Sequence, residues 1–312
     1  MARATVVQAH LGGEVPAYLY DQIRQTRLLN PEVPLYLILE EGIGLEPGFA
    51  REAGVTVARK GAIRPCRNHR LFLRRNRLGR KGLGGFWRFA AERFFAIESL
   101  LEALELENVV HLENDVMLYA GLSDLMPAFE RSCPALGVTM DCRTRCIPGV
   151  VYIKDRGALS ALNEFIIENS LRRGHTDMEA LAAYMAADAG CSALPVVPPA
   201  YRDLNPLESA RGERAAEPWY FEHFEAFGGV FDAAALGQFL GGIDTRGEEV
   251  ETRGFVNETA VYDPRRMDLH WKVEGGLRRP YGRVGKLEFP IFNLHIHSKR
   301  LAEFSSLGQP CR

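Results

Sequence analysis

The 312-residue sequence lacks a long hydrophobic run, a strong net charge and any internal repeat. No apolar stretch approaches the ~20 residues that a membrane-spanning helix needs. The formal net charge of −2 gives no general attraction to nucleic acid, so no nucleic-acid partner is expected. The first residues lead directly into an expected strand, so we expect no signal peptide and a cytoplasmic location. These absences argue against an integral membrane protein and a general nucleic-acid-binding protein.

Regularly spaced cysteines and flexible linkers are also missing. Among the six cysteines, Cys142 and Cys146 lie close together, but no second pair follows at the spacing of a zinc site. We therefore expect free thiols in a reducing compartment. No proline- or serine-rich tract divides the chain, which favours one compact domain. The 46% hydrophobic and 25% charged residues are typical of a globular protein with a substantial core.

The first 60 residues alternate between expected strands and helices. Apolar, β-branched runs at 5–9, 35–39 and 55–57 predict strands, and the segments 16–29 and 45–53 predict helices. Such alternation predicts an α/β fold with a mostly parallel central sheet flanked by helices. Sheets of this kind commonly bind a nucleotide at the carboxyl edge of their strands.

A pair of carboxylates follows the apolar run 109–112, which predicts a buried strand. In an extended chain Glu113 and Asp115 point to the same side, roughly 6–7 Å apart. Carboxylates at the carboxyl end of a buried strand are costly to desolvate unless a cation or a hydrogen-bond donor meets them. The alternative is a solvated strand end that leads into a loop.

A polar pattern near the C-terminus complements these carboxylates. If residues 289–299 are extended, Asn293, His295, His297 and Lys299 share one face. Carboxylate and imidazole groups could hold a divalent cation, and the lysine could bind phosphate oxygens. The alternative is that the histidines are ordinary hydrogen-bonded strand residues.

The segment 59–88 is strongly basic. It carries eleven arginine and lysine residues, no acidic residue and several glycines. It could be a solvated loop, or a flap that meets the phosphates of a ligand or an anionic membrane surface. RNA binding is a weaker alternative, since the segment holds few aromatic residues.

Three further charged residues accompany expected helices. Arg93 lies beside the apolar stripe of a helix expected at 86–107, although it could simply pair with a glutamate of that helix. Asp177 lies in Thr176-Asp177-Met178-Glu179, which predicts a capping box at a helix N-terminus. Asp232 opens a short helix expected within 231–242, where a helix cap is the alternative to a role at a bound hydroxyl.

In their order along the chain, these motifs resemble those of metal-dependent glycosyltransferases with the GT-A fold. Glu113-Asn114-Asp115 is similar to their DxD motif, with Glu in place of the first Asp, and residues 295–299 resemble their late metal and diphosphate motif. The opening strand with Gly-Gly and Pro (5–16), the helix containing Phe-Trp and Glu-Arg-Phe-Phe (86–95), and Gly-Val-Val-Tyr-Ile-Lys (149–154) also match.

The resemblance implies one GT-A domain over residues 1–312. Residues 1–119 would form the nucleotide-sugar-binding half, and 120–312 the acceptor-binding half with a C-terminal metal and diphosphate strand. The implied activity is transfer of a hexose or pentose from a nucleotide-diphosphate sugar to a hydroxyl of a glycan or lipid-linked acceptor, assisted by Mn²⁺ or Mg²⁺.

The resemblance also implies roles for individual residues. The metal ligands would be Asp115, Glu113 and His297, with His295 as the alternative imidazole. The donor and its diphosphate would meet Arg93, Lys299 and His295. The catalytic candidates are Asp232 and Asp177.

Two other functions stay open. A sugar-1-phosphate nucleotidylyltransferase would use a related sheet, but no glycine-rich basic loop follows the first expected strand. A non-enzymatic module could instead bind anionic lipid or RNA through residues 59–88. Contact of this segment with the inner membrane face would also fit an enzyme.

Overall fold

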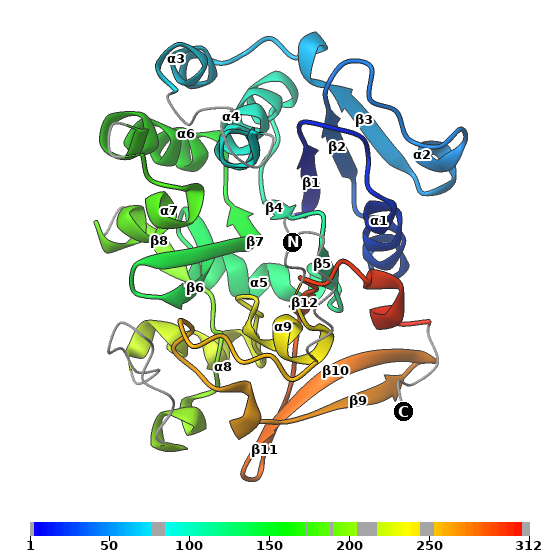
Figure 1. Ribbon diagram of the computed structural model, residues 1–312, viewed down its shortest axis with the longest axis vertical. Coiled ribbons are helices and arrows are strands. Elements are labelled where there is room, and N and C mark those ends of the chain that lie inside the picture. The colour runs from blue at the N-terminus through cyan, green and yellow to red at the C-terminus, as the bar shows by residue number, and fades with distance from the viewer. Residues whose placement is uncertain are drawn as a thin grey trace.

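A seven-stranded sheet with helices on both faces forms the centre of the protein (Figure 1). The computed structural model describes residues 3–76, 85–171, 174–187, 190–204, 217–243 and 253–307. The strands follow the order β3 (Val55–Arg59), β2 (Leu35–Leu39), β1 (Thr5–His10), β4 (Val109–Leu112), β7 (Arg145–Ile153), β6 (Leu136–Cys142) and β8 (Cys191–Ala193).

Most neighbouring strands of this sheet are parallel. The pairs β3–β2, β2–β1, β1–β4 and β6–β8 are parallel, whereas β7 is antiparallel to both β4 and β6. The predicted α/β class, with a mostly parallel central sheet flanked by helices, is confirmed. The antiparallel insertion of β7 was not predicted, because the apolar pattern of a buried strand is the same in both directions.

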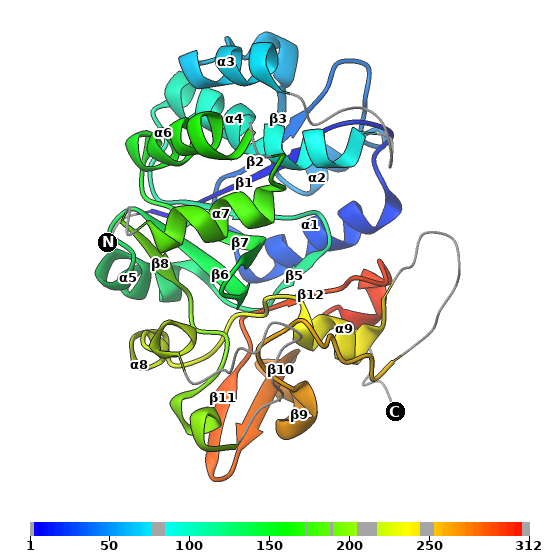
Figure 2. The same ribbon diagram turned by 60° about the vertical axis from the view of Figure 1, so that its left-hand side comes forward.

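Each face of the sheet is covered by its own set of helices (Figure 2). Successive strand residues alternate between two hydrophobic clusters, with Val7 in one and Val6 in the other. The first cluster includes helices α4 (Phe86–Leu104), α6 (Arg156–Phe165) and α7 (Asp177–Ala186), with α3 (Arg67–Arg75) outside them. The second includes α1 (Ala17–Leu29), α2 (Phe49–Glu52) and α5 (Leu122–Ser132).

Helix α4 follows its predicted apolar stripe. Ala90, Phe94, Ile97 and Leu101 are buried, whereas Leu104 is 45% exposed. The helix ends at Leu104, before the predicted residue 107, because Glu105 adopts a left-handed conformation with φ of 51°. The stripe fixes the rotation of α4 and thereby turns the neighbouring Arg93 toward the protein interior.

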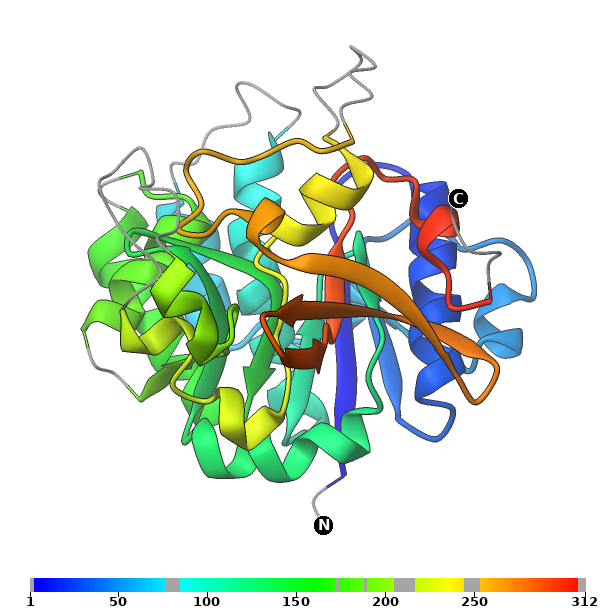
Figure 3. The same cartoon turned by 90° about the horizontal axis from the view of Figure 1, so that it is seen from below.

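The C-terminal third adds two smaller sheets (Figure 3). Strands β9 (Asp268–Glu274), β10 (Leu277–Val284) and β11 (Leu287–Pro290) form an antiparallel sheet. Strand β12 (Asn293–His295) pairs antiparallel with β5 (Val116–Leu118), directly after the acidic turn. Two short helices precede these strands: α8 (Phe224–Phe227) and α9 (Ala235–Gly241). The β12–β5 pair thus joins the last part of the chain to the carboxyl edge of the central sheet.

Two predicted strands differ from the structure. The apolar residues of 194–199 predict a further strand, but the structure has none there, because Pro195, Pro198 and Pro199 have no backbone N–H to donate to a ladder; β8 ends before them at Ala193. The extended run expected at 289–299 is interrupted. Strand β12 ends at His295, and the amide of Lys299 then donates to the Ile296 carbonyl at 3.0 Å in a turn.

The remaining expectations concern cysteines, membrane spans and loops. The five cysteines in the described part of the chain are free thiols, as predicted, and Cys311 lies outside it. Within the described ranges, no helix combines the length and apolarity required to cross a membrane. Residues 77–84 of the basic segment lie outside the described residues. The polar composition of 202–218 and 245–254 predicts two loops, and most of both, residues 205–216 and 244–252, also lies outside the described residues.

Candidate active site

The acidic motif forms a tight turn between β4 and β5. The amide of Glu113 donates to the Gly149 carbonyl at 3.0 Å, and the amide of Val116 donates back to the Glu113 carbonyl at 3.2 Å. The expectation of an extended chain through Asp115 is therefore wrong. The turn nevertheless gathers both carboxylates at the carboxyl end of β4, and Asp115 is buried.

His295 faces this turn because β12 pairs with β5. His295 lies opposite Val116 in the ladder, and the amide of Ile296 donates to the Asp115 carbonyl at 2.9 Å. The Nε2 atom of His295 lies 3.1 Å from Asp115 Oδ2 and 3.7 Å from Glu113 Oε2. One ligand atom from each of these three residues lies within 4.8 Å of the others, so together they could hold a metal ion.

Lys299 reaches the same carboxylate from the turn that follows β12. Its ammonium group forms an ion pair with Asp115, and its Nζ lies 5.6 Å from the ring centroid of Tyr18. The backbone of Lys299 is left-handed, with φ of 63°, a conformation that non-glycine residues seldom adopt. The predicted meeting of the lysine with the acidic motif therefore depends on a turn rather than on strand alternation.

Arg93 joins the acidic turn to helix α7. Its guanidinium group donates to the carboxylate of Glu113 and, at 2.6 Å, to Asp177 Oδ2. Asp177 begins α7, where the predicted capping box is present: Thr176 Oγ1 accepts the amide of Glu179 at 3.3 Å, and the Glu179 carboxylate accepts the amide of Thr176 at 3.0 Å. Six predicted site residues thus form one cluster: Arg93, Glu113, Asp115, Asp177, His295 and Lys299.

The opposite charges in this cluster stabilise one another. Although burial favours neutral carboxyl groups, Arg93 lowers the pKa of Glu113, and His295 and Lys299 hold the pKa of Asp115 well below its usual value. Burial disfavours the imidazolium and ammonium ions, but Asp115 raises the pKa of both His295 and Lys299. For Asp177, burial outweighs the effect of Arg93 and raises the pKa.

His297 lies beside the cluster rather than in it. Its ring centroid is 5.9 Å from that of His295, and the three residues that approach one another within 4.8 Å do not include it. Burial, followed by repulsion from His295, lowers the pKa of His297 to about 4, so its imidazole is neutral. The resemblance predicted His297 as a metal ligand and His295 as a ligand of the diphosphate; the geometry brings His295 nearer to the carboxylates.

Asp232 is fully buried behind His295. Its carboxylate accepts the backbone amides of His295 at 2.9 Å, Leu236 at 2.9 Å and Gly237 at 2.8 Å. Burial raises its pKa to about 6. Two of these amides belong to the first turn of α9, but Asp232 is not the predicted cap residue, because the helix begins at Ala235 with Ala234 in the N-cap position. A role for Asp232 as a base stays a prediction.

Several neighbours of the cluster were not predicted from the sequence. A Cβ atom on Gly149 would lie 3.2 Å from His295 Nδ1 and 3.1 Å from Val116 Cγ2, so a side chain there would crowd the histidine. Asn114 Nδ2 lies 3.0 Å from His10 Nδ1, which links the acidic turn to the end of β1. Gly149 is the first residue of the Gly-Val-Val-Tyr-Ile-Lys motif, and its place in that motif was the sequence signal for a role near the site.

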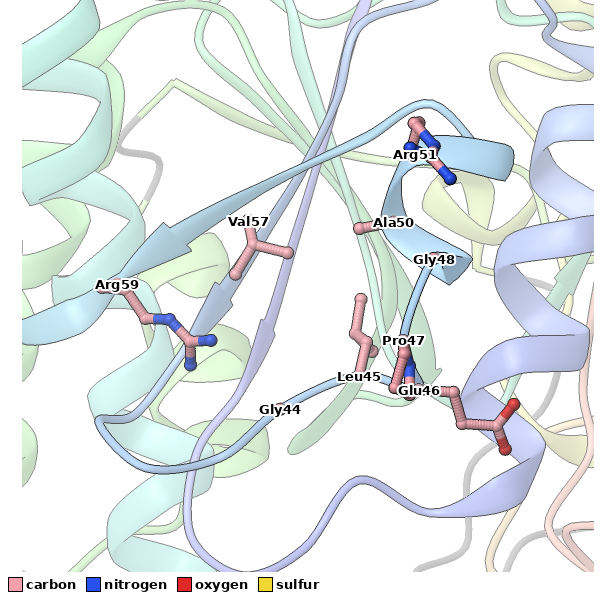
Figure 4. A pocket seen from close by; sticks show the side chains of 9 residues that line it. All are labelled: Gly44, Leu45, Glu46, Pro47, Gly48, Ala50, Arg51, Val57 and Arg59. Carbon is pink, nitrogen blue, oxygen red and sulfur yellow. The ribbon is translucent and has the colours of Figure 1, made fainter.

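A cavity of about 440 Å³ lies elsewhere, at the outer edge of the central sheet (Figure 4). It is bounded by residues 44–48, Ala50 and Arg51 of α2, and Val57 and Arg59 of β3, which is an edge strand. Arg59 is bound to the chain itself, since its Nη1 donates to the Glu40 carbonyl at 3.2 Å. None of the residues that bound this cavity belongs to the acidic turn or to the segment after β12.

No family model matches the chain, and no curated protein matches its sequence. Among solved structures, mouse xyloside xylosyltransferase 1 is 12% identical, with a TM-score of 0.45 over 62% of this chain and 86% of its own. A mutant of the galactosyltransferase LgtC is 14% identical, with a TM-score of 0.43 over 69% and 81%. A cytidylyltransferase from Leptospira borgpetersenii is 10% identical, with a TM-score of 0.37 over 62% and 76%. At these values, the site itself has to carry the functional proposal.

Proposed function

We propose that the protein is a metal-dependent glycosyltransferase with the GT-A fold, formed by one domain over residues 1–312. It would transfer a hexose or pentose from a nucleotide-diphosphate sugar to a hydroxyl group of a glycan or glycoconjugate. The observation that carries the proposal is the meeting of Glu113, Asp115 and His295 within 4.8 Å of one another, beside the ammonium group of Lys299.

The donor set fits a divalent cation. Two carboxylates and one imidazole, which must release its proton when the metal binds, are ligands that suit Mn²⁺, and the carboxylates suit Mg²⁺. The three groups come from the acidic turn and from β12, which the β5–β12 ladder holds together. When bound there, the cation would supply positive charge to the diphosphate of the donor.

The basic residues of the cluster would bind the donor. Negative charge develops on the diphosphate as the glycosidic bond breaks, and fixed cations stabilise that charge most where water is excluded. Lys299 is the candidate for the diphosphate, because its side chain is 31% exposed and can leave Asp115 for a phosphate oxygen. Arg93 is 10% exposed and is fixed between Glu113 and Asp177, which suits it to orient groups near the transferred sugar.

We place Asp177, which accepts a hydrogen bond from Arg93 at 2.6 Å, on the sugar side of the site. A reaction that inverts the anomeric centre needs a base for the acceptor proton. Asp177 suits that role better than Asp232, because the carboxylate of Asp232 already accepts three backbone amides from β12 and α9.

A panel of nucleotide sugars tests the proposal without knowledge of the acceptor. UDP-, GDP- and CMP-sugars are added with and without Mn²⁺, and thermal stability and release of the nucleotide are measured. We expect one nucleotide to stabilise the protein only with the metal, and its sugar donor to be slowly hydrolysed. Release of pyrophosphate from a nucleoside triphosphate and a sugar phosphate would instead indicate nucleotidyl transfer. Absence of metal-dependent binding across the panel would contradict the proposal.

We also propose that helix α3 contacts an anionic membrane surface. Arg67, Arg70 and Arg74 are exposed at helical spacing, and Leu73 between them is 44% exposed. Phe72 anchors the opposite side of α3 by stacking on Phe95 of α4, with ring centroids 4.4 Å apart. Exposed arginines interleaved with an apolar side chain suit lipid headgroups and the acyl boundary below them. Helix α3 lies on the outside of the molecule in both Figure 1 and Figure 2.

Sedimentation with vesicles tests this contact. We expect salt-sensitive binding to vesicles that contain phosphatidylserine and weak binding to phosphatidylcholine alone. Replacing Arg67, Arg70 and Arg74 by Gln should reduce binding at least tenfold, whereas the control Arg24→Gln, an exposed arginine of α1, should not. Vesicle binding without any response to nucleotides and metal would favour the non-enzymatic alternative. Unchanged vesicle binding in the triple arginine variant would contradict the contact.

A further inference from the structure

Within the described part of the chain, Nδ1 of His295 has no partner of the kind that usually orients a metal-binding histidine. Such histidines mostly donate their second ring nitrogen to a carboxylate or a backbone carbonyl, which fixes the ring. In His295 the Nε2 atom faces the carboxylates of the acidic turn, and the buried Nδ1 has no hydrogen-bond partner among the described residues. The described residues therefore restrain this side chain through its main chain rather than through Nδ1.

A buried carboxylate holds the main chain of His295 instead. Asp232 Oδ2 accepts the amide of His295 at 2.9 Å and the amide of Gly237 at 2.8 Å, and Oδ1 accepts the amide of Leu236 at 2.9 Å. One carboxylate thus joins β12 to the first turn of α9. Hydrogen bonds from backbone amides to a fully buried carboxylate are strong, because water cannot replace them.

Asn293 in turn fixes the main chain of Asp232. Its Oδ1 accepts the amide of Asp232 at 3.1 Å, and its Nδ2 donates to the Asp232 carbonyl at 3.1 Å. Asn293 is fully buried and lies two residues before His295 in β12. The loop that carries Asp232 is therefore held to the strand at two points, by a side chain of each segment.

Close packing of α9 completes the arrangement. A Cβ atom on Gly237 would lie 2.0 Å from the His295 carbonyl oxygen, so only glycine permits this approach. The ring of His295 is approached by Gly149 of β7, where a Cβ atom would lie 3.2 Å from Nδ1. The backbone of His295 is thus held from α9, and its ring is bounded by β7.

We propose that Asp232 is a positioning residue for the metal site: it fixes the backbone of His295, in place of a hydrogen bond to the ring, so that Nε2 meets Glu113 and Asp115. The proposal rests on the proposed function and gives Asp232 a different role from that of a base. It predicts that loss of the carboxylate weakens metal binding in the absence of any sugar donor.

The test compares Asp232→Asn with the wild type by two measurements. The first is Mn²⁺ affinity without donor, from the electron paramagnetic resonance signal of free Mn²⁺. We expect a 10- to 100-fold weaker affinity, the usual effect of removing a residue that orients a metal ligand. The second is the nitrogen NMR signal of the His295 ring in the metal-free protein, assigned with His295→Gln, which should shift.

Asp155→Asn is the matched control. Asp155 also uses its carboxylate to accept a backbone amide, that of Ala158 at 2.8 Å at the start of α6, and it is not in the cluster. This variant should keep both the Mn²⁺ affinity and the His295 signal of the wild type. Circular dichroism and thermal melting of each variant establish that it is folded.

The outcomes separate this proposal from the proposed function. If Asp232→Asn is folded and retains both wild-type readings, the positioning role is wrong. If the wild type binds no Mn²⁺, the proposed function fails, and the His295 signal alone decides the positioning role. If Asp232→Asn does not fold, Asn293→Ala replaces it; a His295 signal unchanged in that variant overturns the proposal, and a shifted signal supports it.

Discussion

At the scale of single residues, the candidate site is a balanced set of buried charges. The carboxylates of Glu113, Asp115 and Asp177 meet the side chains of Arg93 and Lys299, and His295 adds a group that can be charged or neutral. Buried charges are costly unless they are paired, so the composition of this cluster is strongly constrained. A ligand that brings a cation and a diphosphate can exchange partners with these groups without leaving a charge alone.

Asp115→Asn tests the residue on which the other groups converge. The amide keeps the shape of the side chain but loses the charge that a metal ion and Lys299 both require. We expect donor hydrolysis to fall at least 100-fold and Mn²⁺ binding to be lost. The melting temperature should stay within a few degrees, since Lys299 is partly exposed and can be solvated. Full activity in this variant would remove the metal role, and Asp155→Asn again serves as the control.

A second group of buried charges lies between α3 and α4, outside the candidate site. The side chain of Glu92 is fully buried and forms an ion pair with Lys60 and contacts Arg88 at 3.3 Å and His69 at 3.4 Å. Although burial favours the neutral acid, these partners lower the pKa of Glu92 from 4.5 to about 2. A lowered pKa stabilises the folded state above the unfolded-state value of 4.5, and this stabilisation is lost as the pH falls toward 2.

Glu92→Gln should therefore destabilise the protein in a pH-dependent way. We expect the free energy of unfolding at pH 7 to fall by roughly 3 kcal/mol, the value of a shift of this size. The difference from the wild type should shrink below pH 4.5, as measured by urea denaturation across pH. Glu102 lies on the same helix as Glu92 and forms an exposed ion pair with Arg156 of α6. The control Glu102→Gln should change stability by less than about 0.5 kcal/mol. A pH-independent loss in Glu92→Gln would exclude the charge as its cause.

At the scale of elements, most parts of the cluster lie where a strand or helix begins or ends. The acidic turn follows β4, Lys299 follows β12 through a left-handed residue, and Asp177 begins α7. Such ends have unpaired backbone groups that neighbouring side chains must satisfy. Small changes at these ends should therefore alter the site more than they alter the core.

Thr176→Ala tests the start of α7. It removes the hydroxyl group that accepts the amide of Glu179, and we expect a loss of about 1 kcal/mol in the free energy of unfolding. The donor KM should rise as Asp177 loses its fixed position. Thr176→Ser keeps the hydroxyl oxygen and should retain most of the stability and the wild-type KM. Equal behaviour of the two variants would show that the cap does not position Asp177.

Gly149→Ala tests the contact of β7 with the ring of His295. The added methyl group would meet His295 Nδ1 at 3.2 Å and Val116 Cγ2 at 3.1 Å, so these neighbours must move by a few tenths of an ångström. We expect Mn²⁺ affinity to fall several-fold and stability to fall by about 1–3 kcal/mol. Gly44→Ala is the control, because its Cβ atom would meet nothing within 4 Å. Unchanged Mn²⁺ affinity in Gly149→Ala would show that the ring tolerates the displacement.

At the scale of the whole molecule, the site joins segments that are distant in the chain. Asp115 and Lys299 are 184 residues apart, and the β5–β12 ladder is the connection that brings them together. A ligand that binds both segments stabilises only the state in which the C-terminal third is docked on the central sheet. Ligand binding should therefore affect the stability of the protein as a whole.

Metal together with the correct nucleotide should raise the melting temperature. At a ligand concentration 100 times the dissociation constant, linkage gives about 2.7 kcal/mol, which corresponds to a shift on the order of 5 °C or more. A chelator should reverse the shift, and Asp115→Asn should not show it. A shift that persists in the chelator would mean that the nucleotide binds without the metal.

Local patterns in the sequence determined the types of element and most of the residues of the site. Alternating apolar runs predicted the parallel strands β1, β2 and β3, and the stripe on α4 predicted the buried side of that helix. The capping box at Thr176 was also correct, because it depends on residues three positions apart. Hydrophobic periodicity and capping act over a few residues, so they can be recognised without knowledge of the fold.

Only the tertiary structure decided how these residues meet. The antiparallel position of β7, the turn at Glu113 and the turn before Lys299 depend on hydrogen bonds between segments that are far apart in sequence. The same holds for the choice of His295 as the imidazole beside the carboxylates, and for the binding of Asp232 to the His295 backbone. A residue's type limits which bonds it can form, but its partner is set by the packing of the whole chain, because a buried polar group must bond to whatever the fold places within reach.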